Sequence, residues 1–294
     1  MTEQIGFIGL GYMGHGMAKN LVEKGFPLTV MAHRKRETID DLKQRGAVEV
    51  ETARAMAKVC DIVVLCVTGS TQVEAILNGP DGLAAAGKPL MVIDCSTSEP
   101  AITVRLAQEL APQGITLIDA PLSRTPKEAW AGTLDVMLGG ASHDVRRARP
   151  VLETFAGRIV ETGATGSAHM MKLLNNFVSL GYGALYAEAL MLGAKAGVSA
   201  QTFHAVIGGG RMDCPFFQTY FEYVVGGNRD AHKFTLDNAL KDLTYLVNFA
   251  SASAAANPVG AAVRNSYALA IGLGRGGDYV PMLTDALALA NKGP

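Results

Sequence analysis

The feature that most constrains the fold lies at the start of the chain, where an apolar run meets three spaced glycines. Residues 5–8 are apolar, and Gly9, Gly11 and Gly14 follow in the arrangement G-x-G-x-x-G before apolar residues recur at helical spacing from Met17. In such a strand–turn–helix unit the first glycine permits a tight turn and the second lets a pyrophosphate approach the backbone. The third glycine lets helix and strand pack closely, and the helix N-terminus faces the anion. We therefore predict a dinucleotide-binding turn that comprises Gly9, Leu10, Gly11, Tyr12, Met13 and Gly14.

The second predicted strand, residues 28–31, should end beside the adenosine ribose of that dinucleotide. NAD-preferring sites usually place an Asp or Glu there to hold the 2′-hydroxyl. This chain has Met31 and Ala32, followed by a basic cluster. A missing carboxylate followed by cations favours the 2′-phosphate of NADP, with NAD as the alternative, although a solvated basic loop would have the same composition. The cluster consists of His33, Arg34, Lys35 and Arg36.

The first half of the chain continues as apolar runs that alternate with helical segments. Residues 62–67 and 90–93 are unbroken apolar runs, as expected for parallel strands buried on both faces. Because ligands bind beyond the carboxyl ends of such strands, the residues there are candidates to line the cofactor. Ser96 or Ser98 could equally cap the helix that follows Pro100. The cofactor candidates at these strand ends are Cys66, Val67, Thr68, Ser96 and Thr97.

From Gly166 the pattern is helical. One long run reaches about residue 196, and its Ala- and Gly-rich continuation suits close helix contacts, including contacts between subunits. We predict an α/β fold with a Rossmann-type doubly wound parallel sheet in residues 1–163, which binds NAD(P). An all-α domain for substrate binding and oligomerisation should follow in residues 164–294, with the site at the seam. We expect a homodimer or a homotetramer.

The beginning of the long helix carries a group of polar side chains. Gly163 and Gly166 loosen the backbone, so the helix should begin near residue 166 or 167. Asn175 and Asn176 lie three and four residues beyond Lys172, so the three side chains can share one face. One ammonium and two carboxamides could protonate and orient a small oxygen-rich molecule. A solvated lysine with two polar neighbours is the plain alternative.

The overall composition excludes several classes of partner. Of 294 residues, 49% are apolar and 18% charged, and the net charge is -1, so we expect a packed core and no general attraction to nucleic acid or to anionic membranes. The four cysteines lack metal-ligand spacing, and we expect reduced core thiols and no metal site. The start is unlike a signal peptide, and no run of about 18 uninterrupted apolar residues exists, which indicates a soluble cytoplasmic protein.

With these motifs in hand, the chain resembles the β-hydroxyacid dehydrogenase family, which includes 3-hydroxyisobutyrate dehydrogenase and tartronate semialdehyde reductase. The resemblance covers essentially the whole chain. It rests on residues 6–14, on Asp119-Ala-Pro leading to Gly132-Thr-Leu, on residues 163–176, and on Lys241-Asp-Leu. It implies hydride transfer between NADP(H), or NAD(H), and a small anionic β-hydroxy acid or aldehyde.

The resemblance also implies roles for individual residues. Lys172 would be the general acid and base, with Asn175 and Asn176 orienting the substrate. His169, one turn earlier, should be a packed helix histidine and not a second acid. Ser96 or Thr97 would touch the nicotinamide side, and Lys241 would reach the cofactor from the helical domain. Ser123 and its neighbours, Arg124 and Thr125, would hold the acid group of the substrate.

Two departures from the family pattern stand out. Ala168 replaces a glycine before the lysine, a change that a helix tolerates. Ser123-Arg124-Thr125 replaces the usual Ser-Gly-Gly, and a buried arginine there would imply a substrate anion held by two or more hydrogen bonds. A similar Arg-Thr pair occurs in sulfolactaldehyde reductases, so a three-carbon sulfonate aldehyde is a candidate beside carboxylates such as tartronate semialdehyde. Arg124 could instead point to solvent or to the cofactor phosphates.

Three other functions compete with this interpretation. An imine reductase would share the two-domain plan but not the lysine-plus-asparagine group. A non-catalytic NADP-binding sensor would be expected to lack the lysine. A larger dehydrogenase of the 6-phosphogluconate kind would need a longer helical half. The presence of Lys172 argues against the first two.

Overall fold

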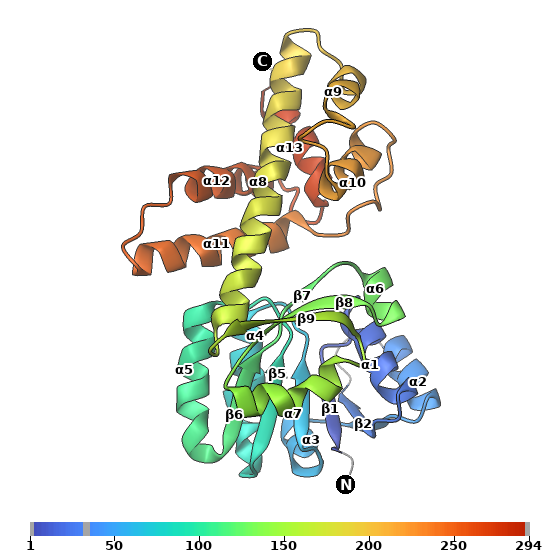
Figure 1. The fold of residues 1–294 in the computed structure, drawn as a ribbon, viewed down its shortest axis with the longest axis vertical. Coiled ribbons are helices and arrows are strands. Elements are labelled where there is room, and N and C mark those ends of the chain that lie inside the picture. Colours follow the sequence, from blue (N-terminus) through green and yellow to red (C-terminus); the bar gives the residue numbers. More distant parts are fainter. Residues whose placement is uncertain (1–2, 32–35, 292–294) are drawn as a thin grey trace. The chain divides into compact units, whose positions relative to one another are not determined.

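The computed structural model describes residues 3–31 and 36–291. The chain forms two compact units, Met1–Lys172 and Leu173–Pro294, which are described one at a time (Figure 1). The limit between them falls inside a long helix, α8, Ser167–Lys195, whose first turn belongs to the first unit. The domain limit predicted after residue 163 lies just before this helix.

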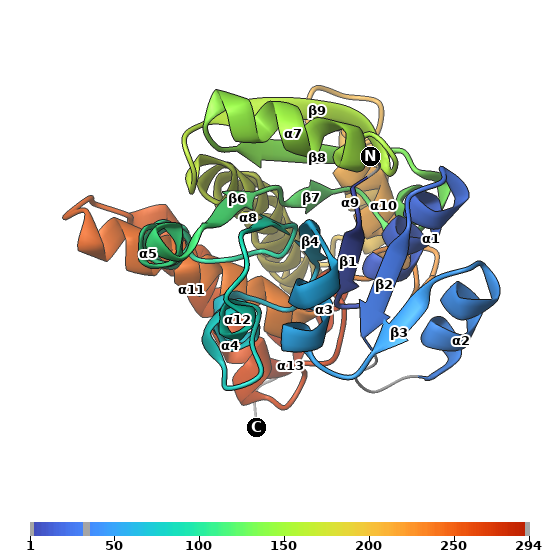
Figure 2. The same cartoon turned by 90° about the horizontal axis from the view of Figure 1, so that it is seen from below.

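The first unit is built on a mostly parallel sheet. Its described strands follow the order β3-β2-β1-β4-β5-β6-β8-β7, with β9 paired to β8. The chain moves outward from β1 to β3 on one side and from β4 to β6 on the other, which is the doubly wound arrangement (Figure 2). The parallel strands are β1 (Ile5–Ile8), β2 (Leu28–Met31), β3 (Val48–Val50), β4 (Ile62–Leu65), β5 (Leu90–Asp94) and β6 (Ile115–Asp119). The last three are β7 (Leu122–Ser123), β8 (Leu134–Gly139), antiparallel to β6 and β7, and β9 (Ala156–Gly163), parallel to β8.

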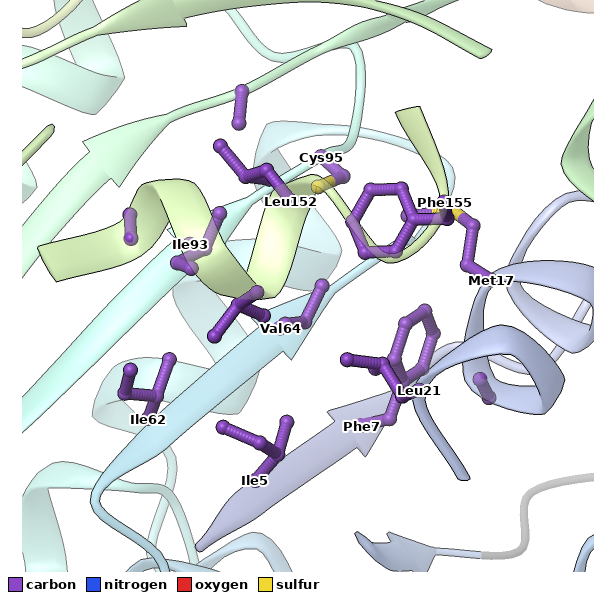
Figure 3. Packing of buried hydrophobic residues seen from close by; sticks show 14 of the residues in the cluster. Ile5, Phe7, Met17, Leu21, Ile62, Val64, Ile93, Cys95, Leu152 and Phe155 are labelled. Atoms are coloured by element: carbon purple, nitrogen blue, oxygen red, sulfur yellow. The ribbon is translucent and has the colours of Figure 1, made fainter. Parts of the chain in front are cut away.

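Helices cover both faces of this sheet because successive strand side chains point to opposite sides. On one face Phe7, Val64 and Ile93 pack with apolar residues of α1, α2, α6 and α7, as Figure 3 shows for part of the cluster. On the other face Ile8 and Leu65 pack with α3, α4 and α5. The helices are α1 (Gly14–Glu23), α2 (Arg36–Gln44), α3 (Ala53–Val59), α4 (Ser70–Asn78), α5 (Pro100–Leu110), α6 (Pro126–Ala131) and α7 (Ser142–Leu152).

The second unit is helical and has a core rich in aromatic side chains. Leu180 of α8 packs there with Phe217, Phe221 and Tyr267. Close approach depends on small residues, since a Cβ on Gly183 would lie 2.9 Å from the Tyr267 hydroxyl. Besides α8, its helices are α9 (Ala200–Ile207), α10 (Pro215–Val224), α11 (Leu236–Ala252), α12 (Pro258–Gly272) and α13 (Leu283–Ala290), with α11 and α12 packed against each other.

Among the described residues, α8 is the helix that is long and apolar enough to cross a membrane by length and composition. A core helix of a globular domain passes the same test, and α8 contributes Leu180, Ala184 and Ala187 to the core of the second unit. Its outer face also carries exposed apolar side chains, among them Val178 and Leu185.

The four cysteines are free thiols in this fold. Cys60 and Cys95 are buried in the first unit, and Cys66 lies between them in sequence at the end of β4. Cys214 lies in the second unit at the N-terminus of α10.

Candidate functional site

The glycine turn between β1 and α1 has glycines that are required for two different reasons. Gly9 has a φ of +102°, and a Cβ there would lie 2.2 Å from the Cys66 carbonyl oxygen. A Cβ on Gly14 would lie 2.0 Å from the carbonyl oxygen of Gly9. The geometry of the chain itself therefore requires both residues to be glycine.

Gly11 is different, because nothing in the chain requires a glycine there. Its backbone is outside the left-handed region, and an added Cβ would meet no atom within 4 Å. Helix α1 begins next to it with Met13 at the N-cap, no side-chain cap and no acidic residue in its first turn. Open space beside backbone N–H groups at a helix N-terminus fits a pyrophosphate that approaches from outside. Leu10 and Tyr12 complete the turn, and Tyr12 is exposed.

Of the basic cluster predicted to bind a 2′-phosphate, His33, Arg34 and Lys35 lie outside the described residues. Arg36 begins α2, and its guanidinium donates to both carboxylate oxygens of Glu49, at 2.5 and 3.2 Å, and to Asp40 at 3.0 Å. This pairing, together with Lys43, lowers the pKa of Glu49 to about 2. Arg36 is thus held along the sheet edge at β3, and its role toward a cofactor stays a prediction.

Ser96 joins the ends of strands β4 and β5. Its hydroxyl accepts a hydrogen bond from the Val67 amide at 3.0 Å, and its own amide donates to Asp94 at 2.9 Å. Ser98 donates to the other carboxylate oxygen of Asp94 at 2.9 Å. Helix α5 instead has Glu99 at its N-cap with no side-chain cap, so neither serine caps it.

The remaining strand-end candidates differ in exposure. Thr68 is exposed, whereas Thr97 is half-buried. Burial raises the pKa of the Cys66 thiol to about 12, so this side chain stays protonated and is a weak nucleophile. Its backbone carbonyl, by contrast, borders the glycine turn next to Gly9.

Asp119, at the end of β6, anchors the start of helix α8. This fully buried carboxylate accepts the Gly166 amide on one oxygen and the His169 amide on the other, both at 2.8 Å. The helix N-terminus therefore receives a negative charge and two acceptors for its unpaired N–H groups. Sequence reasoning noted Asp119 only as part of a family segment and did not assign it this function.

His169 packs as the sequence predicts for a helix histidine. The ring is fully buried, with Nδ1 2.8 Å from the Thr103 hydroxyl and Nε2 3.2 Å from the Ser96 carbonyl oxygen. A carbonyl can only accept, so Nε2 carries a hydrogen toward Ser96. The Thr103 hydroxyl, which also lies 3.2 Å from the Glu99 carbonyl oxygen, joins Nδ1 to α5. The histidine thereby ties the first turn of α8 to the loop after β5.

One turn further along α8, Lys172 is followed by Asn175 and Asn176. Lys172 is half-buried and Asn176 is buried, and their spacing places both side chains on one face of the helix. The Asn176 amide nitrogen donates to the Asp242 carboxylate at 2.6 Å, which fixes the orientation of this carboxamide. Its oxygen accepts a hydrogen bond from Asn175 at 3.2 Å.

Asp242, on α11, organises the polar group of the second unit. Its second oxygen accepts from the Lys241 ammonium at 2.6 Å, and this ammonium also lies 4.8 Å from the ring centroid of Tyr245. Only 2% of Asp242 is exposed, so water cannot stabilise its charge. The hydrogen bonds from Asn176 and Lys241 do so instead. Sequence reasoning assigned Lys241 of this pair to the cofactor but named Asp242, which directly holds Asn176, only as part of a family segment and gave it no role.

The segment Ser123-Arg124-Thr125 forms the turn from β7 into α6. The Arg124 guanidinium is not buried: 49% of the side chain is exposed, and Nε donates to Asp135 at 2.8 Å. The condition under which an anion would be required, a buried and unpaired guanidinium, is therefore not met. Arg124 also has a φ of +86°. This left-handed conformation costs a non-glycine residue roughly 1–2 kcal/mol, whereas a glycine adopts it without strain.

Thr125 is the N-cap of α6 and forms a capping box with Glu128. Its hydroxyl donates to the Glu128 carboxylate at 2.5 Å and accepts from the Lys127 amide at 3.3 Å, while its own amide donates to Glu128 at 3.1 Å. These bonds lower the pKa of Glu128. The structure thus gives Thr125 a local role in starting the helix, whereas Ser123 at the end of β7 is half-buried.

Comparison with known families covers nearly the whole chain. Residues 4–163 match the NAD binding domain of 6-phosphogluconate dehydrogenase. Residues 166–284 match the family described as NAD-binding of NADP-dependent 3-hydroxyisobutyrate dehydrogenase. The first match holds the glycine turn, and the second holds Lys172, Asn176 and Asp242.

Individual relatives agree. The chain is 34% identical to 3-hydroxyisobutyrate dehydrogenase of Pseudomonas aeruginosa over 92% of each chain. It is 31% identical to 3-sulfolactaldehyde reductase of Escherichia coli over 92% of this chain and 91% of that one. The solved structure of Mycobacterium tuberculosis 3-hydroxyisobutyrate dehydrogenase with L-serine has a TM-score of 0.85 at 28% identity, covering 98% of this chain and 99% of that one. The chain thus belongs to the β-hydroxyacid dehydrogenase family and is an NAD(P)-dependent dehydrogenase.

Proposed function

We propose that this enzyme interconverts a small anionic β-hydroxy acid and the corresponding aldehyde, with Lys172 as the general acid and base. The observation that carries the proposal is the geometry of α8. Lys172 lies one turn before Asn176, and the Asn176 carboxamide is fixed by the buried Asp242 carboxylate. The nicotinamide cofactor, when bound, supplies or accepts the hydride.

The lysine and the two asparagines have different roles in the proposed reaction. In reduction the Lys172 ammonium donates a proton to the oxygen that develops negative charge, and in oxidation neutral Lys172 accepts it. One N–H of Asn176 donates to Asp242, so the carboxamide is held in place. Its oxygen accepts one hydrogen bond from Asn175 and has a second lone pair for a substrate hydroxyl. Asn175 is held at its amide nitrogen, so its own oxygen can also accept from the substrate.

The glycine turn would hold the cofactor pyrophosphate, with NADP preferred over NAD because of the basic residues 33–36. Ser96, Thr97 and Lys241 would border the cofactor. By their names, the Pseudomonas and Escherichia relatives act on a small hydroxy acid and a small sulfonated aldehyde. This chain is about equally identical to both, so the comparison does not decide whether its substrate carries a carboxylate or a sulfonate. We assign that choice, carboxylate or sulfonate, to Ser123 and Arg124. We also infer a soluble cytoplasmic homodimer or homotetramer.

The test is NADPH consumption with a panel of short aldehydes, some bearing a carboxylate and some a sulfonate. Lys172→Ala should lower kcat by about 10²- to 10⁴-fold, the usual contribution of a positioned acid. Lys195→Ala is the matched control, because Lys195 lies on the same helix, is exposed, and among the described residues donates only to the backbone carbonyl of Asn291.

Three results would overturn parts of the proposal. If Lys172→Ala and Lys195→Ala behave alike, Lys172 is not the acid. If cyclic imines are reduced and aldehydes are not, the enzyme is an imine reductase. Tighter binding of NADH than of NADPH, together with unchanged NADPH affinity in the His33→Ala/Arg34→Ala double variant, would show that the basic cluster does not select NADP.

A further inference from the structure

Two residues in contact with each other, Arg124 and Asp135, each lower the stability of the fold. Among the described residues, Arg124 and Ala254 are the non-glycine residues with a positive φ. A glycine at position 124 would adopt φ +86° without strain. The ion pair that the arginine forms with Asp135 is half-exposed, and such pairs contribute little to stability. Folding stability therefore gives no reason for an arginine at this position.

Asp135 also destabilises the fold, through a carboxylate oxygen that is unpaired within the described part of the chain. It lies on β8, directly opposite Ser123 of β7. One carboxylate oxygen accepts the Arg124 Nε hydrogen bond at 2.8 Å, while the other, Oδ1, is buried and has no hydrogen-bond partner among the described residues. A buried acceptor without a partner loses its hydration and gains nothing in return. The two residues that weaken the fold contact each other, and strain of this kind concentrates at functional sites.

The hydrogen bond between them determines which part of the guanidinium stays available. An arginine has five N–H donors, one on Nε and four on the two terminal nitrogens. Asp135 accepts from the Nε donor, and among the described residues Nη1 and Nη2 of Arg124 form no hydrogen bond. The other acidic neighbour, Glu128, is occupied by Thr125. The terminal edge, which matches two oxygens of a carboxylate or a sulfonate, is left for a ligand.

We propose that Asp135 is a positioning residue, which holds Arg124 by Nε so that its terminal edge binds the acid group of the substrate. This rests on the proposed function, in which Arg124 helps to select that group, and adds the residue that sets its orientation. The anchored guanidinium should favour aldehydes with a carboxylate or a sulfonate over uncharged aldehydes of equal length.

The first test separates KM from kcat. With an anionic three-carbon aldehyde, Asp135→Ala should raise KM about tenfold, the value of one charge-assisted hydrogen bond, and leave kcat nearly unchanged. With propanal, neither constant should change. Asp135→Asn keeps an acceptor for Nε and should restore most of the lost affinity. Glu109→Ala is the matched control, since Glu109 pairs with Arg105 at 3.0 Å in a similarly exposed ion pair.

The second test is a double-mutant cycle. In an Arg124→Gly background, Asp135→Ala should raise KM no further, because Asp135 acts only through the arginine. Arg124→Gly itself should raise the Tm, because it removes the backbone strain, while it weakens binding of the anionic substrate. If Asp135→Ala raises KM equally in both backgrounds, or raises it for propanal as well, its effect is structural and the proposal is wrong.

A third measurement keeps the inference separate from the proposed reaction. Calorimetry of protein loaded with NADPH, titrated with 3-hydroxypropionate and with 3-hydroxypropane-1-sulfonate, measures binding without turnover, because the reduced cofactor cannot accept a hydride from an alcohol. Weaker binding of either ligand to Asp135→Ala supports the positioning role even if no aldehyde is reduced. If the wild type reduces aldehydes and Asp135→Ala binds both ligands as tightly as the wild type, the proposed function stands and this inference fails.

Discussion

The turns before and after Lys172 on α8 are both held by a buried aspartate, but in different ways. Before the lysine, Asp119 accepts two backbone amides, those of Gly166 and His169. After it, Asp242 accepts a side-chain amide, that of Asn176, and a lysine ammonium. A carboxylate bound to backbone fixes where the helix starts, whatever its side chains are. A carboxylate bound to a carboxamide fixes which atom of that carboxamide is offered to a ligand.

The comparison therefore separates stability from activity. Removing Asp119 should weaken the fold of the first unit. Removing Asp242 should mainly affect the chemistry, because Asn176 can then rotate. Three substitutions test this separation, from the largest expected effect to the smallest.

Asp119→Ala should have the largest effect, on the free energy of unfolding. It leaves two buried amides without an acceptor, and each costs roughly 1–3 kcal/mol, so we expect a loss of about 2–6 kcal/mol in urea denaturation. Asp119→Asn retains one acceptor, so its free energy of unfolding should lie between those of the wild type and Asp119→Ala. Asp81→Ala, at an exposed position, is the control and should change little. A loss no larger than that of the control would show that Asp119 does not anchor α8.

Asp242→Ala should lower kcat/KM by about 10- to 100-fold, because a misplaced orienting group has effects of that size. Asp237→Ala is the control on the same helix, since Asp237 is exposed in the first turn of α11. Steady-state kinetics and urea denaturation should be measured on both variants. If Asp242→Ala unfolds the protein and retains the activity of its folded fraction, the two aspartates are equivalent and the comparison fails.

Thr125→Ala removes an exposed helix cap and should have the smallest effect. Loss of an N-cap costs about 1 kcal/mol, so stability should fall by that amount while KM for the substrate is unchanged. The Thr125 hydrogen bonds lower the pKa of Glu128 in the folded state, so this stability is present above the ordinary glutamate value of 4.5 and is lost as the pH falls through the folded-state pKa. The difference between wild type and variant should therefore shrink in acid. A raised KM would instead assign Thr125 to the substrate.

Much of the fold could be predicted from sequence because its strands are buried on both faces. The runs at β1 and β4, and β5 up to its terminal Asp94, carry no polar side chain, which a scan of the sequence detects. Strand β3 was not predicted, since it lies at the sheet edge and is short and partly exposed. Helices α3 and α4 were also missed, because they have only 7 and 9 residues and little periodicity can develop over that length.

The arrangement of the candidate site could be predicted where it depends on residues close together in the sequence. The spacing of Lys172, Asn175 and Asn176 is visible in the sequence, and the helix starts where Gly163 and Gly166 indicated. The partners of these residues were not, because Asp119 and Asp242 lie 47 and 66 positions from the amides they bind. The Thr125-Pro-Lys-Glu capping box could have been recognised from sequence, but was assigned to the substrate.

The positions of the cysteines offer a separate way to follow each unit. Cys60, Cys66 and Cys95 belong to the first unit, whereas Cys214 is the only cysteine in the sequence of the second. A buried thiol reacts with an alkylating reagent only when its surroundings open. A short alkylation pulse at increasing urea, followed by peptide mass analysis, would therefore label the buried Cys95 when the sheet opens. Cys214 is only partly buried, so opening of the helical unit would appear as a rise above its labelling in the native state. Coincident labelling would show that the enzyme unfolds as one cooperative body, and separate labelling would show two.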